Sequence, residues 1–275
     1  DEVPVHCNVL HPTHAGALNA PRGKMRLGYC STCGHLYNYA FDSALTTYTE
    51  AYENSLHFSP RFQRYAEELA SELIARYDLH HKTVIEIGCG KGDFLRLMCE
   101  LGKNHGIGFD TSYPPETTTA ENKELFTVIQ DLYSQKYSHY NADFVCCRHV
   151  LEHIQSPRSF IATIRSSCGT RQQCGLYVEV PNALYTLRDF GIWDLIYEHC
   201  SYFTPGSLSR LFASSGFVVE RLDEKFDGQF LGIEVLPSVS NTISELSNEN
   251  EVEGNKKLVD VFAANYRTKV EQWKQ

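Results

Sequence analysis

The sequence lacks an excess of positive charge and lacks any long apolar run, and both absences restrict its function. Its 25 Lys and Arg residues are outnumbered by 34 Asp and Glu, which gives a net charge of −9. Because nucleic-acid binding depends on a basic surface, this balance argues against DNA or RNA as a partner. No apolar stretch approaches the roughly 20 residues that span a bilayer, and the N-terminus has no signal pattern. We therefore expect a cytoplasmic protein, without a membrane partner, that acts on a small molecule.

Cysteine is not scarce, but the positions of the ten cysteines argue against disulfide bonds. Cys89, Cys146 and Cys147 lie in apolar runs typical of buried strands, where reduced thiols are common. With 275 residues, 42% of them apolar, the chain can bury a full core, so we expect one large domain with appendages. The start on Asp and the stop at Gln275 inside a helical pattern favour a trimmed or released fragment, although a frayed terminal helix explains the end equally well.

The pattern divides the chain into three regions. Residues 1–58 are irregular and dense in His, Cys, Pro, Gly and Tyr, which predicts an N-terminal recognition segment. Residues 59–237 begin with an amphipathic helical pattern and then alternate β-rich runs with helical ones, which predicts an α/β core with a mostly parallel sheet. Its last two runs, FVVERL and QFLGIEVL, predict an antiparallel hairpin. Residues 238–275 predict a polar linker to Gly254, then a helix from Leu258.

The most specific motif is VIEIGCGKGDF, which begins at Val84. Its glycines follow a strand and open a helix, so a nucleotide-like cofactor can approach bare backbone there. A P-loop needs Ser or Thr after its lysine, and here Gly92 follows Lys91. A dinucleotide site needs G-x-G-x-x-G, whereas here Glu86 stands two residues before the first glycine. That acid suits a cationic amino-acid group better than a pyrophosphate.

Two further carboxylates follow the next strands. Asp110 ends GIGFD, where a carboxylate can bind both hydroxyls of a ribose, and Asp131 in VIQDLY is placed for an adenine amino group. Together with ADFVCCRHVLEHI and YFTPGSLSRLFASSGF, these residues resemble the class I S-adenosylmethionine-dependent methyltransferases from Thr83 to Leu236.

The resemblance implies an α/β fold with a seven-stranded Rossmann-like sheet in the order 3-2-1-4-5-7-6, and the methyl donor lies over the carboxyl ends of strands one to four. The residues expected to bind S-adenosylmethionine are Glu86, Gly88, Gly90, Asp110, Asp131, Arg148 and Tyr52. In HVLEH, which is recurrent in this superfamily, His149, Glu152 and His153 are expected to position the donor pocket rather than take part in the chemistry.

The N-terminal stretch CSTCGH places Cys30 and Cys33 in the C-x-x-C-G form of a zinc knuckle. The other half of a structural zinc site would come from Cys7 with His11, or with His6 or His14 instead. Zinc would supply folding free energy that the few apolar residues of this segment cannot. The alternative is a pair of reduced cysteines in a loop.

The late stretch DLIYEHCSYF gathers ionisable side chains after the fifth strand. An acceptor beside the sulfonium needs a base, and histidine titrates near neutral pH, so His199 is the predicted general base. Glu198 is expected to fix its tautomer or bind an acceptor hydroxyl, and Tyr197 to stabilise an enolate oxygen. The alternative is a histidine that only caps a strand end.

The cysteine-bearing segment, the methyltransferase core and the late stretch together resemble the zinc-containing C-methyltransferases of nucleotide-bound keto-deoxysugars in antibiotic pathways. That family has a pattern closer to Y-H-E-H-x-S-Y-F, so Glu198 and His199 match it and Tyr197 is one position out of step. It also has two cysteine pairs at its zinc site, where this chain has the lone Cys7, and a further domain that is absent up to Gln275.

The sequence thus predicts methyl transfer from S-adenosylmethionine to a carbon beside a ketone, in a keto-deoxysugar or similar small natural-product intermediate, with His199 as the base. O-methylation of a sugar or other natural-product hydroxyl is the first alternative. A non-catalytic S-adenosylmethionine-binding module is the second. The sequence does not indicate an oligomeric state.

Overall fold

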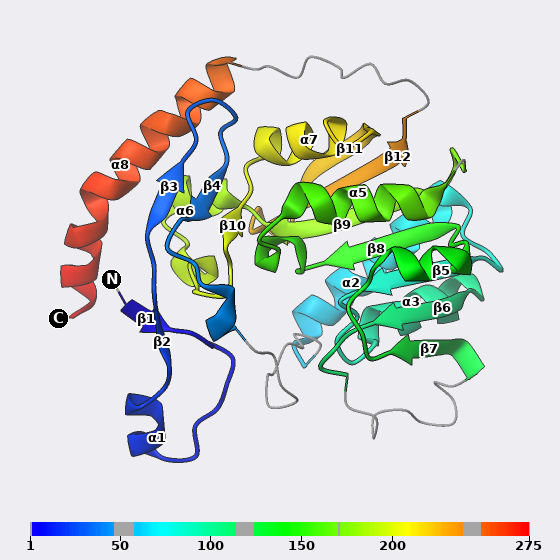
Figure 1. The fold of residues 1–275 in the computed structure, drawn as a ribbon, viewed down its shortest axis with the longest axis horizontal. Helices are drawn as coiled ribbons and strands as arrows, with labels where there is room; N and C mark the ends of the chain where they lie inside the picture. The colour runs from blue at the N-terminus through cyan, green and yellow to red at the C-terminus, as the bar shows by residue number, and fades with distance from the viewer. Residues whose placement is uncertain (1, 47–57, 114–123, 170, 239–248, 275) are drawn as a thin grey trace.

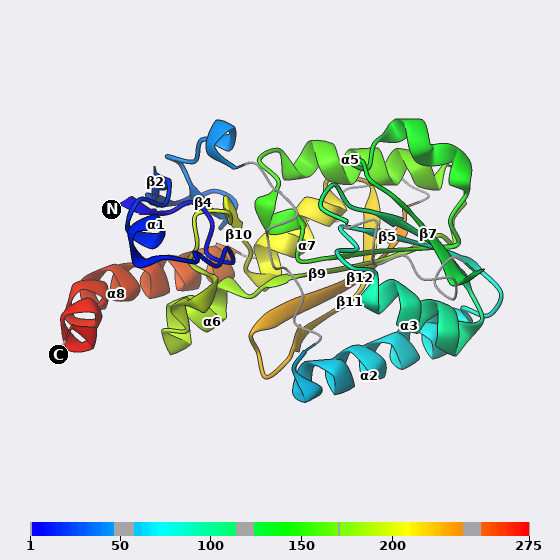
Figure 2. The same cartoon turned by 90° about the horizontal axis from the view of Figure 1, so that it is seen from below.

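The structure is a computed structural model that describes residues 2–46, 58–113, 124–169, 171–238 and 249–274. A large twisted sheet with helices on both faces forms the main body of the molecule (Figure 1). The N-terminal strands and the C-terminal helix lie side by side at one end of this body, as both views show (Figures 1 and 2). The two ends of the chain therefore belong to one corner of the fold.

The central sheet has seven strands in the order β7-β6-β5-β8-β9-β12-β11, which is the predicted order 3-2-1-4-5-7-6. Strands β5 to β9 are parallel, whereas β12 is antiparallel to both β9 and β11, so the predicted edge hairpin is confirmed. The bounds are β5 Thr83–Ile87, β6 His105–Phe109, β7 Phe126–Ile129, β8 Phe144–Arg148, β9 Gly175–Pro181, β11 Phe217–Lys225 and β12 Phe230–Pro237.

Helices cover both faces of the sheet, because its central strands are apolar on both sides. Helices α2 (Pro60–Tyr77) and α3 (Asp93–Gly102) pack on one face, and α5 (Pro157–Cys168) and α7 (Pro205–Ala213) pack on the other (Figure 2). Every residue of β8 and β9 is buried. Among the described helices, none is long and apolar enough to cross a membrane.

The N-terminal segment forms two small sheets rather than a fully irregular region. Strands β1 (Glu2–Pro4) and β2 (Arg22–Lys24) pair with each other, and the short helix α1 (His14–Leu18) lies between them in the chain. In the second sheet, β4 (Leu36–Asn38) pairs with β3 (Leu27–Tyr29) on one side and with β10 (Ser201–Tyr202) on the other. The N-terminal segment is thus joined by hydrogen bonds to the late stretch of the core.

The remaining elements connect the sheet to this end of the molecule. They are helix α6 (Ala183–Asp189) and the 3-10 turns Ser43–Leu45, Gln135–Tyr140, Leu151–His153 and Ile192–Asp194. The buried residues of α6 form a small cluster with β4, β10 and the C-terminal helix.

Helix α8 (Glu249–Trp273) begins inside the stretch that was predicted to be a linker, so that boundary was wrong. The reason is a tertiary contact. The Glu251 carboxylate accepts a hydrogen bond from Gly206 N at 3.0 Å and pairs with Arg210 at 3.2 Å, which ties the first turn of α8 to α7. Further along, Phe262 stacks on Phe190 with ring centroids 5.7 Å apart.

Candidate functional site

The glycine turn after β5 is shaped by its backbone and by one tight contact. Gly88, Gly90 and Gly92 have φ values of +71°, +54° and +82°, a region that favours glycine. A Cβ on Gly88 would lie 2.1 Å from Val150 Cγ2, so Val150, just past the end of β8, packs directly on the turn. The segments that follow β5 and β8 therefore pack against each other.

Asp110 is held against this turn by hydrogen bonds. Gly90 N donates to Asp110 Oδ2 at 2.8 Å, and the amide and hydroxyl of Ser112 donate to Oδ1 at 2.8 and 2.7 Å. Because a carboxylate oxygen accepts more than one hydrogen bond, both oxygens can still accept from a ribose. The carboxylate is thus oriented at the strand end where the sequence predicts the ribose.

Glu86 lies beneath the turn, with only 3% of its surface exposed, and its Oε2 has no hydrogen-bond partner. Burial raises its pKa to about 8, against the opposing effect of the Arg148 cation. The carboxyl is therefore mostly neutral at pH 7, and an ammonium group bound nearby would favour its ionised form.

The other predicted cofactor residues have partners within the protein. Asp131 accepts hydrogen bonds from Lys136 and Tyr137, which lower its pKa to about 2. The Arg148 guanidinium donates to Glu179 through Nε at 3.1 Å and Nη2 at 2.8 Å. Tyr52 lies outside the described residues. The cofactor contacts of these three residues stay predictions.

Tyr197 and Glu198 direct their side chains toward the N-terminal segment, away from His199. The Tyr197 hydroxyl accepts from Asp42 N at 2.9 Å, and its ring covers Gly23, where a Cβ would lie 2.2 Å from it. The fully buried Glu198 carboxylate accepts from Cys7 N at 3.2 Å and lies 3.3 Å from His6 Nδ1. Both side chains thus anchor the N-terminal segment, and their predicted contacts with an acceptor stay predictions.

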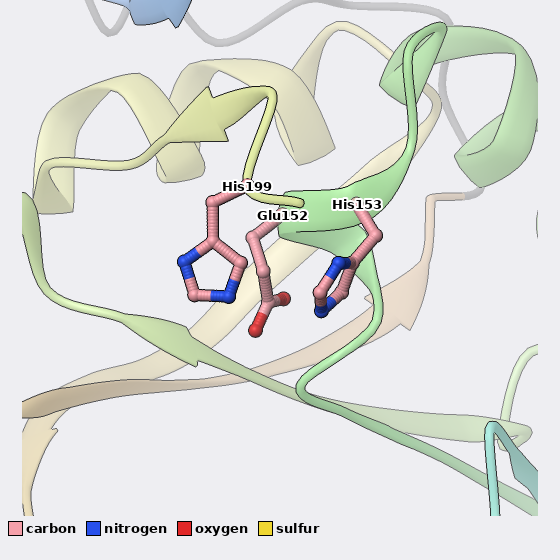
Figure 3. A group of neighbouring side chains, drawn as sticks. All are labelled: Glu152, His153 and His199. Carbon is pink, nitrogen blue, oxygen red and sulfur yellow. The ribbon is translucent and has the colours of Figure 1, made fainter. Parts of the chain in front are cut away.

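His199 instead lies beside Glu152 and His153, and the three side chains form one group (Figure 3). The ring centroids of the two histidines are 4.8 Å apart. His199 Nδ1 is 2.8 Å from the Asp194 carbonyl oxygen and His153 Nδ1 is 3.1 Å from the Glu198 carbonyl oxygen. A carbonyl only accepts, so each Nδ1 carries the proton and each Nε2 carries the lone pair.

The surroundings of His199 favour its neutral form. Burial, helped by repulsion from His153, lowers its pKa to about 3. Burial opposes the charge of Glu152, but His149, His153 and His199 outweigh burial and lower the pKa of this carboxyl. The general-base role of His199 stays a prediction, and a ring with so low a pKa is a weak proton acceptor at neutral pH.

His149 links this group to the buried ion pair of β8 and β9. Its φ is +55°, an uncommon value for a residue other than glycine, and its amide donates to the Glu179 carbonyl at 2.8 Å. His149 Nε2 lies 3.0 Å from Glu179 Oε1, and Nδ1 lies 3.8 Å from Glu152 Oε1. Burial opposes its charge, but these two carboxylates outweigh burial and raise its pKa to about 9.

A family model described as a methyltransferase domain matches residues 61–222, which is more than half of the 275 residues. The chain belongs to this methyltransferase family. It is an enzyme that uses S-adenosylmethionine as its methyl donor. Among proteins of curated function, none matches the sequence significantly.

Solved structures share the fold of this methyltransferase. One is the 1,6-didemethyltoxoflavin N1-methyltransferase of Burkholderia thailandensis, with a TM-score of 0.50 and 14% identity over 65% of this chain and 81% of that chain. A weaker similarity, with a TM-score of 0.47 and 18% identity over 64% of this chain and 84% of that chain, is to the magnesium protoporphyrin IX methyltransferase of Synechocystis PCC 6803. At these identities the likeness shows the fold alone.

The sequence did not indicate that Glu152 and His153 meet His199. HVLEH was interpreted as a structural motif, because it recurs whatever the substrate. The sequence does show that its histidines and glutamate lie just past the end of β8, next to the glycine turn after β5. His199 comes from the loop before β10, and no local pattern joins the two segments.

The predicted zinc ligands do not come together in the structure. Cys30 and Cys33 share a tight turn, closed by Gly34 N donating to Cys30 O at 2.8 Å, and Arg210 holds this turn through Cys33 O. Cys7 is held elsewhere, by Glu198. Among the described residues, no three of the ligand atoms of Cys7, His11, Cys30 and Cys33 lie within 4.8 Å of one another. This set therefore does not fit a zinc ion as placed.

Proposed function

We propose that this methyltransferase methylates a carbon beside a ketone in a small acceptor of the keto-deoxysugar type. The observation that carries the proposal is the position of the group formed by Glu152, His153 and His199. It follows Val150, which packs on Gly88 of the donor turn. An acceptor bound at this group would thus be near the sulfonium, and orientation of that kind supplies much of the rate in group transfer.

The group suits an acceptor that carries oxygen atoms. It offers two imidazole Nε2 lone pairs and a carboxylate, and these acceptors bind hydroxyl groups by hydrogen bonds. Transfer forms a bond between the methyl group and the acceptor carbon, breaks the bond between the methyl group and sulfur, and passes a proton from that carbon to a water molecule. We propose that Glu86, Gly88, Gly90 and Asp110 hold the donor for this step.

The proposal also gives a role to the three regions of the chain. Residues 1–58 would recognise the acceptor, residues 59–237 would catalyse the transfer, and residues 238–275 would support the recognition segment. In support, β4 pairs with β10, three residues after Glu198, and the side chains of Tyr197 and Glu198 hold the N-terminal segment against the core. The recognition segment thus contacts the same stretch that carries His199.

The test is mass spectrometry of nucleotide-linked 4-keto-deoxysugars, incubated in heavy water with the protein and methyl-labelled S-adenosylmethionine. We expect the label on a carbon of the sugar and deuterium exchange at that carbon. The matched control is Asp110→Asn, which keeps the size of the side chain but weakens the predicted ribose contact, and should lose turnover with a donor affinity reduced about tenfold.

Other results would point elsewhere. Label on a sugar oxygen without exchange would establish the O-methyltransferase instead. Tight donor binding with no labelled product from any sugar would contradict the sugar acceptor. Absence of labelled product from other natural-product scaffolds as well would contradict the proposal that this site performs carbon methylation.

A further inference from the structure

We propose that Glu152, His153 and His199 bind one divalent transition-metal cation, and that this cation holds an oxygen atom of the methyl acceptor. Within the part of the chain that the structure describes, this is the group of His, Cys, Asp and Glu side chains whose ligand atoms all lie within 4.8 Å of one another. The acceptor part rests on the proposed function, whereas the cation site stands on the side chains alone.

The two imidazole rings are oriented as metal ligands usually are. Each ring donates from Nδ1 to a backbone carbonyl, His199 to Asp194 at 2.8 Å and His153 to Glu198 at 3.1 Å. A histidine that binds a metal commonly donates its other ring N–H to a carbonyl or carboxylate, which fixes the tautomer and the ring plane. Both rings thus carry the Nε2 lone pair, the atom that a cation would take.

The carboxylate beside the rings is buried and accepts no hydrogen bond. Glu152 is 1% exposed, and neither of its oxygens has a hydrogen-bond partner. A buried carboxylate without hydrogen bonds is costly unless a cation compensates it. His149 forms an ion pair with it, but Nδ1 lies 3.8 Å from Glu152 Oε1, beyond hydrogen-bond distance, so both oxygens keep the lone pairs that a cation would bind.

The donor set indicates the kind of cation. Two imidazole nitrogens and one carboxylate oxygen suit zinc, manganese, iron or cobalt in the divalent state. Ligands around such an ion lie roughly 3–4 Å apart, because each bond is about 2.0–2.2 Å long. The separations of up to 4.8 Å found here need only small side-chain rotations to reach this geometry.

Three protein ligands leave a coordination position open, as catalytic metal sites do. Because the group follows Val150, which packs on the donor turn, the open position would lie close to the donor. A keto oxygen or hydroxyl of the acceptor is a suitable ligand for it, and the cation would polarise that oxygen as a Lewis acid. In this arrangement Nε2 of His199 is a ligand, which excludes its use as a general base.

The test measures cation binding to the whole protein without donor or acceptor. After removal of metals with a chelator, Mn²⁺ is titrated and the free ion is followed by electron paramagnetic resonance. Manganese is chosen because thiolates bind it poorly, so the N-terminal cysteines contribute little. We expect one Mn²⁺ per chain and a higher unfolding temperature in its presence, because the ion binds the folded state.

Glu152→Gln keeps the side-chain size but removes the charge, and should weaken Mn²⁺ binding by about tenfold or more. The matched control is Glu234→Gln, since Glu234 is also buried and has one oxygen without a partner, but lies on β12 with Arg76 on its other oxygen. If Glu152→Gln fails to fold, His153→Gln gives the same test. No binding up to about 1 mM, or equal loss in Glu152→Gln and Glu234→Gln, would overturn the site.

A second measurement tests the acceptor. A keto-sugar labelled with oxygen-17 should broaden the Mn²⁺ resonance if its oxygen is a ligand. Methylation of the sugar without broadening would overturn the acceptor contact and leave the proposed function standing. Binding of Mn²⁺ without any methylation of sugars would contradict the proposed acceptor and leave the cation site standing.

Discussion

At the scale of single residues, Gly88 is the position in the glycine turn after β5 that tolerates an added side chain least. Its φ of +71° excludes most side chains, and a Cβ would lie 2.1 Å from Val150 Cγ2. We expect Gly88→Ala to lower the free energy of unfolding by about 2–4 kcal/mol and to abolish donor binding. Urea unfolding and calorimetry with S-adenosylmethionine check both effects.

The matched control for this substitution is Gly254→Ala. Gly254 lies within α8, and nothing comes within 4 Å of a Cβ added there. It should raise helix propensity and leave stability equal or slightly higher. Equal destabilisation by both variants would contradict the account of the turn.

Glu86 gives a prediction about pH. Its pKa in the folded protein is about 8, above the ordinary value of 4.5, so between these values the folded state holds a proton that the unfolded chain releases. The free energy of unfolding should therefore fall as pH rises through this window, by up to about 1.4 kcal/mol per unit. In Glu86→Gln this contribution should vanish, whereas in a variant of the exposed Glu100, Glu100→Gln, it should persist.

Urea unfolding at pH 5.5 and 7.5 measures the difference. If the free energy of unfolding falls with pH as steeply in Glu86→Gln as in the unchanged protein, burial of this carboxyl does not control the pH dependence.

Residue types indicated the donor site better than the acceptor site. Glu86, the glycines and Asp110 belong to one strand, turn and strand, so their spacing was visible in the sequence. Glu152 and His153 meet His199 only because the loop before β10 returns to the end of β8, a tertiary contact that no local pattern contains. Tyr197 and Glu198 were predicted to act on the acceptor, and the sequence did not indicate that their side chains also bind the N-terminal segment.

At the scale of elements, the buried Tyr197, in the loop before β10, anchors the N-terminal segment. The Tyr197 hydroxyl accepts from Asp42 N at 2.9 Å and lies 3.3 Å from Asp42 O. We expect Tyr197→Phe to destabilise this segment by about 1 kcal/mol, because the hydrogen bonds of its hydroxyl to the Asp42 backbone are lost. Limited proteolysis should then cleave residues 2–46 several times faster, with little change in the unfolding of the core.

The control is Tyr39→Phe, which removes a hydroxyl from a ring that is 59% exposed in the same segment. Its cleavage rate should match that of the unchanged protein. Faster cleavage in both variants would mean that the segment responds to any loss of a hydroxyl, and would contradict the anchoring role of Tyr197.

The sheet was predictable because its strands are short, β-branched and separated by helical periods, and the order followed from the resemblance. The start of α8 was not, because its first turn is polar and acidic and has no apolar period. What makes it helical is the binding of Glu251 to Gly206 and Arg210, which lie more than forty residues earlier in the chain. The small strands of the N-terminal segment are three residues each, too short for a period to appear.

At the scale of the whole molecule, Arg210 joins three separate parts of the chain. From α7 it donates to the Cys33 carbonyl through Nε at 3.1 Å and Nη2 at 2.9 Å, and it pairs with Glu251 of α8. We expect Arg210→Ala to increase amide hydrogen exchange in both residues 30–38 and the first turns of α8. The free energy of unfolding should fall by about 1–3 kcal/mol, since charge-assisted hydrogen bonds to a carbonyl and a carboxylate disappear together.

Arg158→Ala is the control, since Arg158 is a surface arginine that bonds Ser214 Oγ at 3.2 Å. Exchange in the two segments should stay unchanged in this variant. An effect of Arg210→Ala on only one segment would show that the cysteine turn and α8 are held independently.

Glu198 has a wider consequence. Its carboxylate binds the backbone of Cys7, while its carbonyl oxygen fixes the ring of His153. One residue thus serves the N-terminal segment on one side and the predicted acceptor site on the other. By thermodynamic reciprocity, any effect of the N-terminal segment on acceptor affinity through Glu198 equals the effect of the acceptor on the binding of that segment to the core. The two ends of this residue form an energetic link, so an exchange of N-terminal segments between related enzymes would also alter the acceptor affinity of the core that receives it.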